Sequence, residues 1–485
     1  MLEMSMNRRL LPNQRLRDAV LHLPSAPTGP DADSTSLGGP RRKADLPLQP
    51  STWSIRAALA ALFSFELLFL LFLSAGRIKA NSYLAWMPVD LTGLLFTLSV
   101  IAGAFIVLTK KVNRHGLVIA GAMAVFATWL FVSLLWTLGV VYAHQKVLGV
   151  VLACWACAGG AVIIAADRAR VRRFLTLLVL LAVWFAIEGI FAYAKAEKRW
   201  FVEIGGTSYA GLGNTVGYGA VIVVATLISL RRLGAFKVVL AALLGVFVFI
   251  MLVAGSRHPV LGLALVLLLA ATAGFRPTSG IGLQRYQIAA LVLLILAVSA
   301  VVALILSESS TFTLGRFETL LFTEGGGRST HERQVAMAKA AHFWASAPVL
   351  GHGVGSFPIL ENWVTDERRH PHNVILEILC ELGLVGLILF GAFLLSALSC
   401  FKLQRLREDP LFRCVFLLAV FDLSHALVGP DLTEHRLLYA MLGLLALPEP
   451  QPMPGKLDFE GSDAAARENS ARPTAAPPQQ QLQSG

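Results

Sequence analysis

The chain is poor in charge. Only 15% of its 485 residues are Asp, Glu, Lys or Arg, whereas a soluble globular protein has about 25%. Hydrophobic residues make up 56% of the chain, and its mean hydropathy is +0.66. These figures exclude a soluble multidomain enzyme, a disordered chain and a fibrous protein. They predict an all-α polytopic membrane protein.

The sequence also lacks the features by which a net charge of +11 would indicate nucleic-acid binding. No soluble module carries a basic patch interleaved with aromatic side chains. A membrane protein gathers Lys and Arg on its cytoplasmic loops. We therefore attribute the charge to membrane topology and expect no nucleic-acid partner.

Cysteine is scarce, and its positions predict no disulfide framework. The five cysteines lie within or beside apolar runs: Cys154, Cys157, Cys380, Cys400 and Cys414. The first two have the spacing of a redox CxxC motif, but no strand–turn–helix context surrounds them. We favour simple helix packing by buried thiols.

The N-terminal region has no apolar h-region, so it does not resemble a signal peptide. Residues 1–52 are polar, basic and rich in Pro, Ser and Gly, and residues 449–485 end in a Pro/Gln-rich stretch. Such compositions cannot support a core. We expect two disordered cytoplasmic tails flanking a transmembrane catalytic domain at 53–448.

Apolar runs long enough to cross a bilayer predict about twelve transmembrane helices. They lie near 57–76, 91–109, 117–138, 147–166, 174–194, 216–230, 238–255, 260–274, 288–307, 374–400, 412–429 and 437–448. Lys and Arg are concentrated in the loops after the even-numbered spans. The opposite loops hold fewer, among them Arg77, Lys146, Arg257 and Arg436. The positive-inside rule then puts both tails in the cytoplasm.

One predicted outer loop, 308–372, is much longer than the others, and long connections of this kind are usually functional. Arginine on the outer side also runs against the topological bias. Arg257 lies in the tight turn Gly255-Ser256-Arg257-His258-Pro259. It is either a snorkelling interfacial side chain or a phosphate clamp, because a guanidinium fork matches phosphate oxygens at two points.

Within the long loop, a Gly-rich stretch opens a run of good helix formers. The sequence reads Gly325-Gly326-Gly327-Arg328-Ser329-Thr330-His331-Glu332-Arg333. We expect Ser329 or Thr330 to cap a helix whose N-terminal amides face an anion. Arg328, His331 and Arg333 would then assist in binding it. The alternative is a Gly-rich hinge before an ordinary capped helix.

The loop ends in Arg368-Arg369-His370-Pro371-His372-Asn373. Asn373 is a natural N-cap for the following span, and Glu377 lies one turn further in. A histidine fixed at such a helix start is suited to act as a general base near neutral pH. The loop histidines lack the spacing of a helical zinc site, so we expect no metal.

Four features together resemble the O-antigen ligase and O-antigen polymerase superfamily of bacterial inner membranes. These are about a dozen spans with one late periplasmic loop; a loop arginine followed by Pro348-x-x-Gly351-x-Gly353-x-Gly355-Ser356-Phe357; His372-Asn373-x-x-Leu376-Glu377 before Gly383-x-x-Gly386; and Ser256-Arg257 at an outer turn. Gly211-x-Gly213-Asn214 is only loosely similar to a further family segment. Arg328 and Arg333 both remain candidates for the family arginine, and Arg333 has the better spacing to Pro348.

The resemblance implies a GT-C-like glycosyltransferase of the bacterial inner membrane with its active site facing the periplasm. A glycan would pass from undecaprenyl diphosphate to a sugar hydroxyl of lipid A–core, with inversion and without a nucleotide, metal or other cofactor. His372 would act as the base, and Arg257, Arg328 and Arg333 would stabilise the leaving diphosphate. His331, Arg369, His370 and Asn373 would complete substrate binding.

Two alternatives remain open. A polymerase of the same superfamily would share these motifs and transfer the glycan to another repeat. A secondary transporter or flippase of lipid-linked glycans would place ionisable residues in mid-membrane and show an internal repeat. Glu66, Glu188 and Asp422 are candidate intramembrane acids, but the two halves of the chain do not match. We therefore favour an enzyme, and among enzymes a ligase.

Overall fold

The computed structural model describes residues 64–79, 82–84, 86–110, 112–195, 201–205, 207–230, 235–272, 313, 316–317, 319–320, 323, 327–361 and 368–450. All of them belong to one compact unit, residues 54–485. The predicted ninth span, 288–307, and the predicted tails lie outside the described residues, apart from positions 449 and 450.

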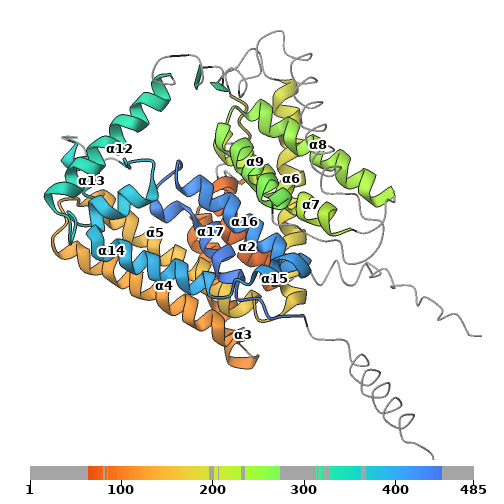
Figure 1. The fold of residues 1–485 in the computed structure, drawn as a ribbon, viewed down its shortest axis with the longest axis horizontal. Coiled ribbons are helices and arrows are strands. Elements are labelled where there is room, and N and C mark those ends of the chain that lie inside the picture. Colours follow the sequence, from red (N-terminus) through yellow and green to blue (C-terminus); the bar gives the residue numbers. More distant parts are fainter. Residues whose placement is uncertain are drawn as a thin grey trace, which may run out of the picture. The chain divides into compact units, whose positions relative to one another are not determined.

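Every named element in the described ranges is a helix, beside one isolated bridge between Ile204 and Thr207. The membrane-part helices are α2 (Phe65–Ile78), α3 (Leu91–Thr109), α4 (Arg114–Val132), α5 (Val141–Ala158), α6 (Arg168–Ala194), α7 (Tyr209–Ser229), α8 (Ala235–Ala254), α9 (Arg257–Thr272), α14 (Val374–Leu398), α16 (Pro410–Ala426) and α17 (Arg436–Leu444) (Figure 1). Shorter or peripheral elements are η1 (Ser82–Leu84), η2 (Ser133–Leu135), the π-helical η3 (Gly159–Ile164), α12 (Arg328–Ser346), α13 (Phe357–Leu360), α15 (Leu403–Glu408) and η5 (Leu432–Glu434).

Seven helices in the described ranges are long and apolar enough to cross a membrane: α3, α4 with η2, α5 with η3, α6, α7, α8 and α14. This confirms an all-α polytopic membrane fold. The predicted sixth span, 216–230, begins earlier than expected, at Tyr209, because the Ser208 hydroxyl accepts a hydrogen bond from Gly211 N at 3.2 Å and so caps the helix.

The predicted twelfth span, 437–448, is wrong as a helix that crosses the bilayer by itself. Its helix, α17, has nine residues, which is about 14 Å at 1.5 Å per residue, against a hydrocarbon core of about 30 Å. The segment 427–435, irregular apart from the short η5, leads into it, and Pro448 O accepts a hydrogen bond from Arg168 at the start of α6. Irregular backbone at this depth is tolerated only where the protein buries it.

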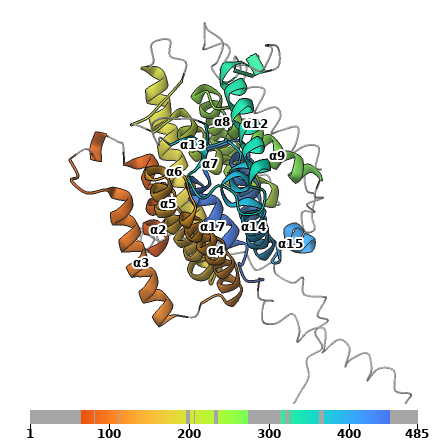
Figure 2. The same cartoon turned by 90° about the vertical axis from the view of Figure 1, so that its left-hand side faces the viewer.

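Helix α7 is the most enclosed of the spanning helices. It contacts α6, α8, α9 and α16, and Figure 1 shows it beside α6, α8 and α9; Figure 2 gives the same helices from the side. Gly217 faces the ring of Phe421, and Gly219 faces Ala182 and Phe247. These glycines leave room for the neighbouring side chains, so α7 packs closely against the helices around it.

Helix α14 is interrupted at Gly383, and residues 348–355 of the long loop, the inserted segment, bond to the backbone on both sides of the interruption. Gly383 has a φ of +66°, which interrupts the helix. Across the gap, Cys380 O accepts from His352 N at 3.0 Å and Glu381 O accepts from Gly353 N at 2.8 Å. On the other side, Pro348 O and Val349 O accept from Leu384 N at 2.9 Å and from Val385 N at 3.2 Å.

The glycines of the inserted segment are required by this contact. Gly351, Gly353 and Gly355 all have positive φ angles, which favour glycine. A Cβ at Gly351 would meet the backbone of Glu381, and one at Gly355 would meet Ala143. The glycines of this motif therefore let the backbone of the loop approach another helix closely.

A buried lysine holds the broken helix against α5. The sequence pattern placed Lys146 in an outer loop, but it lies within α5 with a side chain only 2% exposed. Its Nζ is 2.5 Å from Glu377 Oε1 and 2.7 Å from Glu381 Oε2. The same carboxylates accept from Leu432 N and Gly355 N. One charge cluster thus fixes α14, the inserted segment and the turn after α16.

Candidate functional site

The turn that follows α16 brings three predicted site residues together. Leu427 O, Val428 O and Gly429 O are consecutive carbonyls just beyond the helix end. They accept from Asn373 Nδ2 at 3.1 Å, from Arg333 Nη1 at 3.1 Å and from His372 Nδ1 at 3.4 Å. Carbonyls at a helix C-terminus have no partners within the helix and carry partial negative charge. This turn is therefore a natural anchor for donor and cationic side chains.

His372 has the geometry of a base. Its φ of +58° makes it the one non-glycine residue with a positive φ in the described part of the chain, and such strain concentrates at functional sites. Partial burial, followed by the charge of Arg333, lowers its pKa, so the ring is neutral near pH 7. If Nδ1 donates to Gly429 O, Nε2 presents its lone pair to a ligand.

Asn373 confirms the predicted start of α14. Its side-chain oxygen accepts from Ile375 N and Leu376 N, both at 3.0 Å, and thereby caps the helix. Its amide nitrogen meanwhile binds Leu427 O. The cap therefore ties the backbone next to His372 to the turn after α16.

Three arginines gather where α9 and α12 begin. Arg257, at the start of α9, donates to Arg316 O at 3.3 Å and to Thr330 Oγ1 at 3.1 Å. Arg316 donates to Gly255 O at 2.7 Å, and its guanidinium lies over the rings of Phe201 and Tyr209. Arg333, from α12, lies close enough that burial and the charge of Arg316 lower its pKa.

We call Arg257, Arg316 and Arg333 the arginine cluster. No ion pair joins any of the three to a carboxylate among the described residues. Like charges held together without a counter-ion repel one another and are stabilised by an anionic ligand. Guanidinium groups suit phosphate oxygens in particular. The arrangement thus favours a diphosphate.

Arg328 and His331 are not part of this cluster. The Arg328 side chain is 94% exposed and pairs with Glu332 at 2.9 Å on the helix surface; His331 is also exposed. The expected Ser329 or Thr330 cap is wrong, because α12 already begins at Arg328. Gly327 precedes the helix with a φ of +82° and without a side-chain cap. Thr330, inside the first turn, instead accepts from Arg257.

The two residues before Pro371 differ from each other. Arg369 is exposed, and its guanidinium lies 3.7 Å from Glu361. The His370 ring stands 4.4 Å from that of His372, edge to face. Both His370 ring nitrogens are buried without a hydrogen-bond partner in the structure. Burial lowers the pKa of His370 to about 3, so the ring is neutral.

Sequence reasoning missed a group of buried side chains beneath the turn. His258 and His425 stack with ring centroids 4.0 Å apart, and Asn214 binds both rings. His258 in turn contacts Ser256 Oγ at 3.0 Å, next to Arg257. The Gly211-x-Gly213-Asn214 motif was the available signal for Asn214. No local sequence pattern indicated a role for Arg316 or His425 in the site, because their partners are remote in sequence.

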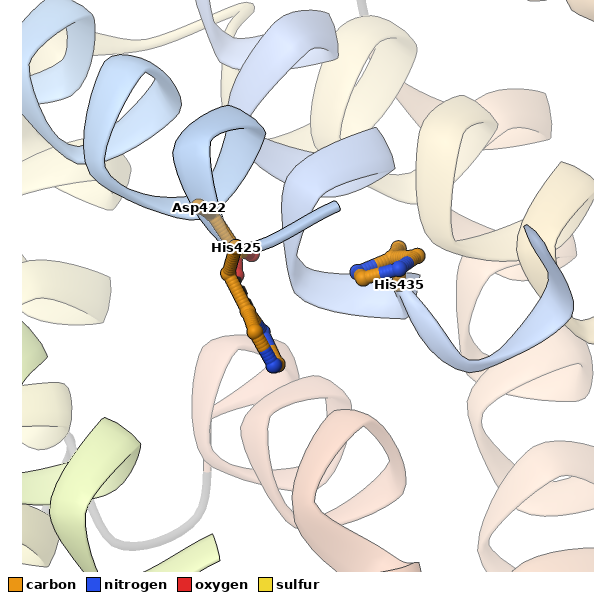
Figure 3. A group of neighbouring side chains, drawn as sticks. All are labelled: Asp422, His425 and His435. Carbon is orange, nitrogen blue, oxygen red and sulfur yellow. Dashed lines mark ion pairs between the residues drawn. The ribbon is translucent and has the colours of Figure 1, made fainter. Parts of the chain in front are cut away.

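Part of this group has donors suited to a metal ion. Asp422, His425 and His435 offer one atom each within 4.8 Å of one another (Figure 3). Hydrogen bonds already occupy some of these atoms. Asp422 Oδ1 accepts from Tyr218 at 2.9 Å, and His435 Nε2 lies 3.2 Å from Pro430 O. Zinc–nitrogen bonds of about 2.0–2.1 Å would require the side chains to draw closer together. The sequence pattern did not indicate this set, because His425 and His435 lie outside the long loop that holds the other candidate histidines.

Comparison with known proteins adds an independent finding. A protein-family model described as O-Antigen ligase matches residues 248–391. No curated protein matches the chain. The matched segment contains all of the arginine cluster together with His370, His372 and Asn373, whereas the anchoring turn, His425 and His435 lie beyond it.

Proposed function

Residues 248–391 match the O-antigen ligase family model, and from this premise we propose that the chain is an O-antigen ligase of the O-antigen ligase/polymerase superfamily. It transfers a glycan from undecaprenyl diphosphate to a sugar hydroxyl of lipid A–core. The bond between the anomeric carbon and the diphosphate oxygen breaks as the acceptor oxygen attacks from the opposite side, which inverts the anomeric centre. The reaction uses no nucleotide, metal or other cofactor.

The observation that carries this proposal is the arginine cluster beside a neutral, strained histidine. The leaving diphosphate gains negative charge as the glycosidic bond breaks. Donors already fixed where that charge develops stabilise the transition state without reorganisation. Arg257 is held by Arg316 O and Thr330 Oγ1, and Arg333 by Val428 O. These contacts fix the guanidinium groups before the donor binds.

The acceptor supplies the proton. A sugar hydroxyl is a weak nucleophile, and a positioned base with a pKa near the working pH accelerates its attack. His372 Nε2 takes the hydroxyl proton while Nδ1 stays bonded to Gly429 O. The imidazolium that forms then lies between the turn carbonyls and the departing diphosphate, both of which favour its charge.

Two of the three candidate acids that would suggest transport are engaged in structural contacts. Glu66 pairs with Arg173 at 2.9 Å, and Asp422 accepts from Tyr218 at 2.9 Å. The three guanidinium groups of the arginine cluster instead pair with no carboxylate among the described residues, as an enzyme that binds a diphosphate requires. This contrast supports the enzyme over a secondary transporter or flippase.

The setting follows from the same proposal. The protein lies in the bacterial inner membrane, with both termini in the cytoplasm and the site open to the periplasm. Its partners are the lipid-linked donor, lipid A–core and the surrounding membrane lipids. Arg369, His331 and Arg328, which are exposed, would meet the more distant parts of the substrates.

The deciding experiment combines deletion with reconstitution. Deletion of the gene should leave surface lipopolysaccharide without its glycan while polymer accumulates on the lipid carrier; purified protein in detergent should restore transfer without an ion gradient. Single repeats attached to the core after deletion would instead identify a polymerase. Failure of transfer in detergent, together with export that depends on a gradient, would identify a transporter.

A further inference from the structure

A separate polar pocket lies among α5, η5 and the start of α17. Its volume is about 160 Å³, well above the roughly 10–15 Å³ that one water needs and below the about 300 Å³ at which drug-sized pockets begin. Its polar lining consists of Tyr142, Gln145, Lys146, Arg368, Asp431, Thr433, Glu434 and Arg436. A pocket of this size takes one small polar unit rather than a chain.

The electrostatics of this pocket differ from those of the arginine cluster. Arg368 pairs with Glu434 and lies 3.5 Å from Asp431. Although burial acts against ionisation, the charges of Lys146 and Arg368 hold the pKa of Asp431 below its usual range. Two carboxylates thus face the pocket together with three cations, Lys146, Arg368 and Arg436, so the pocket lacks the uncompensated positive charge of the arginine cluster. Balanced donors and acceptors, with a phenol and an amide, instead suit the hydroxyl groups of a sugar.

The pocket is adjacent to the base through His370. Lys146, Arg368 and Asp431, which line the pocket, all act on the pKa of His370, and the ring of His370 contacts that of His372. On the far side, His372 is within the electrostatic reach of Arg333. The histidine pair therefore stands between an anion site and a polar pocket, which is where two substrates of a transfer reaction must meet.

Building on the proposed glycosyl transfer, we propose that this pocket binds the sugar unit of the acceptor that carries the attacking hydroxyl, and that His370 is a positioning residue for His372. The His370 ring packs edge to face against that of His372 with centroids 4.4 Å apart, and Arg368, two residues before it, lines the pocket. His372 removes the proton of the attacking hydroxyl, whose oxygen bonds to the anomeric carbon of the donor while the arginine cluster holds the leaving diphosphate.

Steady-state kinetics on full-length protein in detergent test this assignment. Gln145 is exposed at the pocket, so Gln145→Trp should fill the space without disturbing the core. With purified lipid A–core as acceptor and an undecaprenyl-diphosphate-linked glycan as donor, we expect its acceptor KM to rise by about tenfold or more, a loss of about 1.4 kcal/mol or more. The donor KM should stay unchanged. Gln404→Trp, on the exposed face of α15, is the matched control.

A binding measurement separates failure of this inference from failure of the proposed function. Lipid-free core oligosaccharide, titrated into protein without donor, should bind wild type and Arg257→Ala equally and Gln145→Trp about tenfold more weakly. A higher donor KM in Gln145→Trp, or an unchanged acceptor KM, overturns the pocket assignment while transfer itself stands. If wild type transfers nothing and binds no oligosaccharide, both proposals fail.

Discussion

Two arginines on α12, five positions apart, provide a matched test of the site. Arg333 is half-buried and bonded to Val428 O at 3.1 Å. Arg328 is on the same helix with a 94% exposed side chain, paired only with Glu332. Either could match the family motif by sequence, but the structure brings only Arg333 to the arginine cluster. Arg333→Ala should therefore disable transfer, and Arg328→Ala should not.

The expected size of the effect follows from what each side chain touches. Removing one preorganised donor to a developing oxyanion costs about 10²–10³-fold in kcat, or roughly 2.7–4 kcal/mol. An exposed i,i+4 ion pair such as Arg328–Glu332 contributes only about 0.3–0.5 kcal/mol, and to stability rather than to the reaction. Arg333→Lys should fall between wild type and Arg333→Ala, because ammonium keeps the charge but cannot bind both Val428 O and phosphate in a planar fork.

The assay is the initial rate of glycan transfer at matched protein levels, with product resolved on a gel and detergent-extracted yield as the folding control. Near-wild-type rates for Arg333→Ala together with a large loss for Arg328→Ala would refute the assignment of the cluster. Equally large losses of transfer in Arg333→Ala and Arg328→Ala would show that the first two turns of α12 as a whole, rather than one guanidinium group, determine activity.

Four further outcomes are expected. Arg257→Lys should stay severely impaired but fold normally, and near-normal transfer would reduce Arg257 to an interfacial charge. His372→Ala should lose roughly 10²–10⁴-fold, whereas His370→Ala should lose modestly; the reverse order would refute the choice of base. Transfer should continue in EDTA, and loss restored by added Zn²⁺, Mn²⁺ or Mg²⁺ would make Asp422, His425 and His435 suspected ligands. Finally, His370 and His435 have folded pKa values of about 3 and about 4, below the ordinary value of about 6.5. The unfolded chain therefore binds more protons as the pH falls through 6.5, so the melting temperature should decrease from pH 7 towards 4, and an increase would contradict this.

The sequence predicted much of the fold, because apolar run length and capping residues act locally. The runs near 91–109 and 374–400 correspond to α3 and α14, and Asn373 caps α14 as expected. The predicted start of a helix was wrong where a polar residue earlier in the chain caps the helix, as Ser208 does for α7. The prediction that 437–448 spans the membrane was wrong because the apolar residues of α17 are buried in protein rather than in lipid.

The site was only partly predictable, since its remaining parts depend on contacts between distant segments. Histidine and arginine motifs in the long loop are visible in the sequence. The backbone carbonyls after α16 carry no side-chain signal, and any sequence could supply them. Arg316 joins the arginine cluster through Gly255 and two aromatic rings, and the pairing of Lys146 with two glutamates spans more than 200 positions. Neither contact follows from periodicity.

Because α14 is interrupted and its free backbone groups bond to the loop, insertion of the helix into the membrane and docking of the loop can be two separate steps. A continuous helix at 374–398 would bond Leu384 N to Cys380 O and Val385 N to Glu381 O, leaving no amide unsatisfied during insertion into lipid. Docking of the loop exchanges those two bonds for the four that cross the gap. The newly made chain can thus enter the bilayer as an ordinary helix and receive the loop afterwards. A mutant in which Gly351 or Gly353 blocks docking would still be a correctly inserted protein, normal in abundance and topology but without an assembled site.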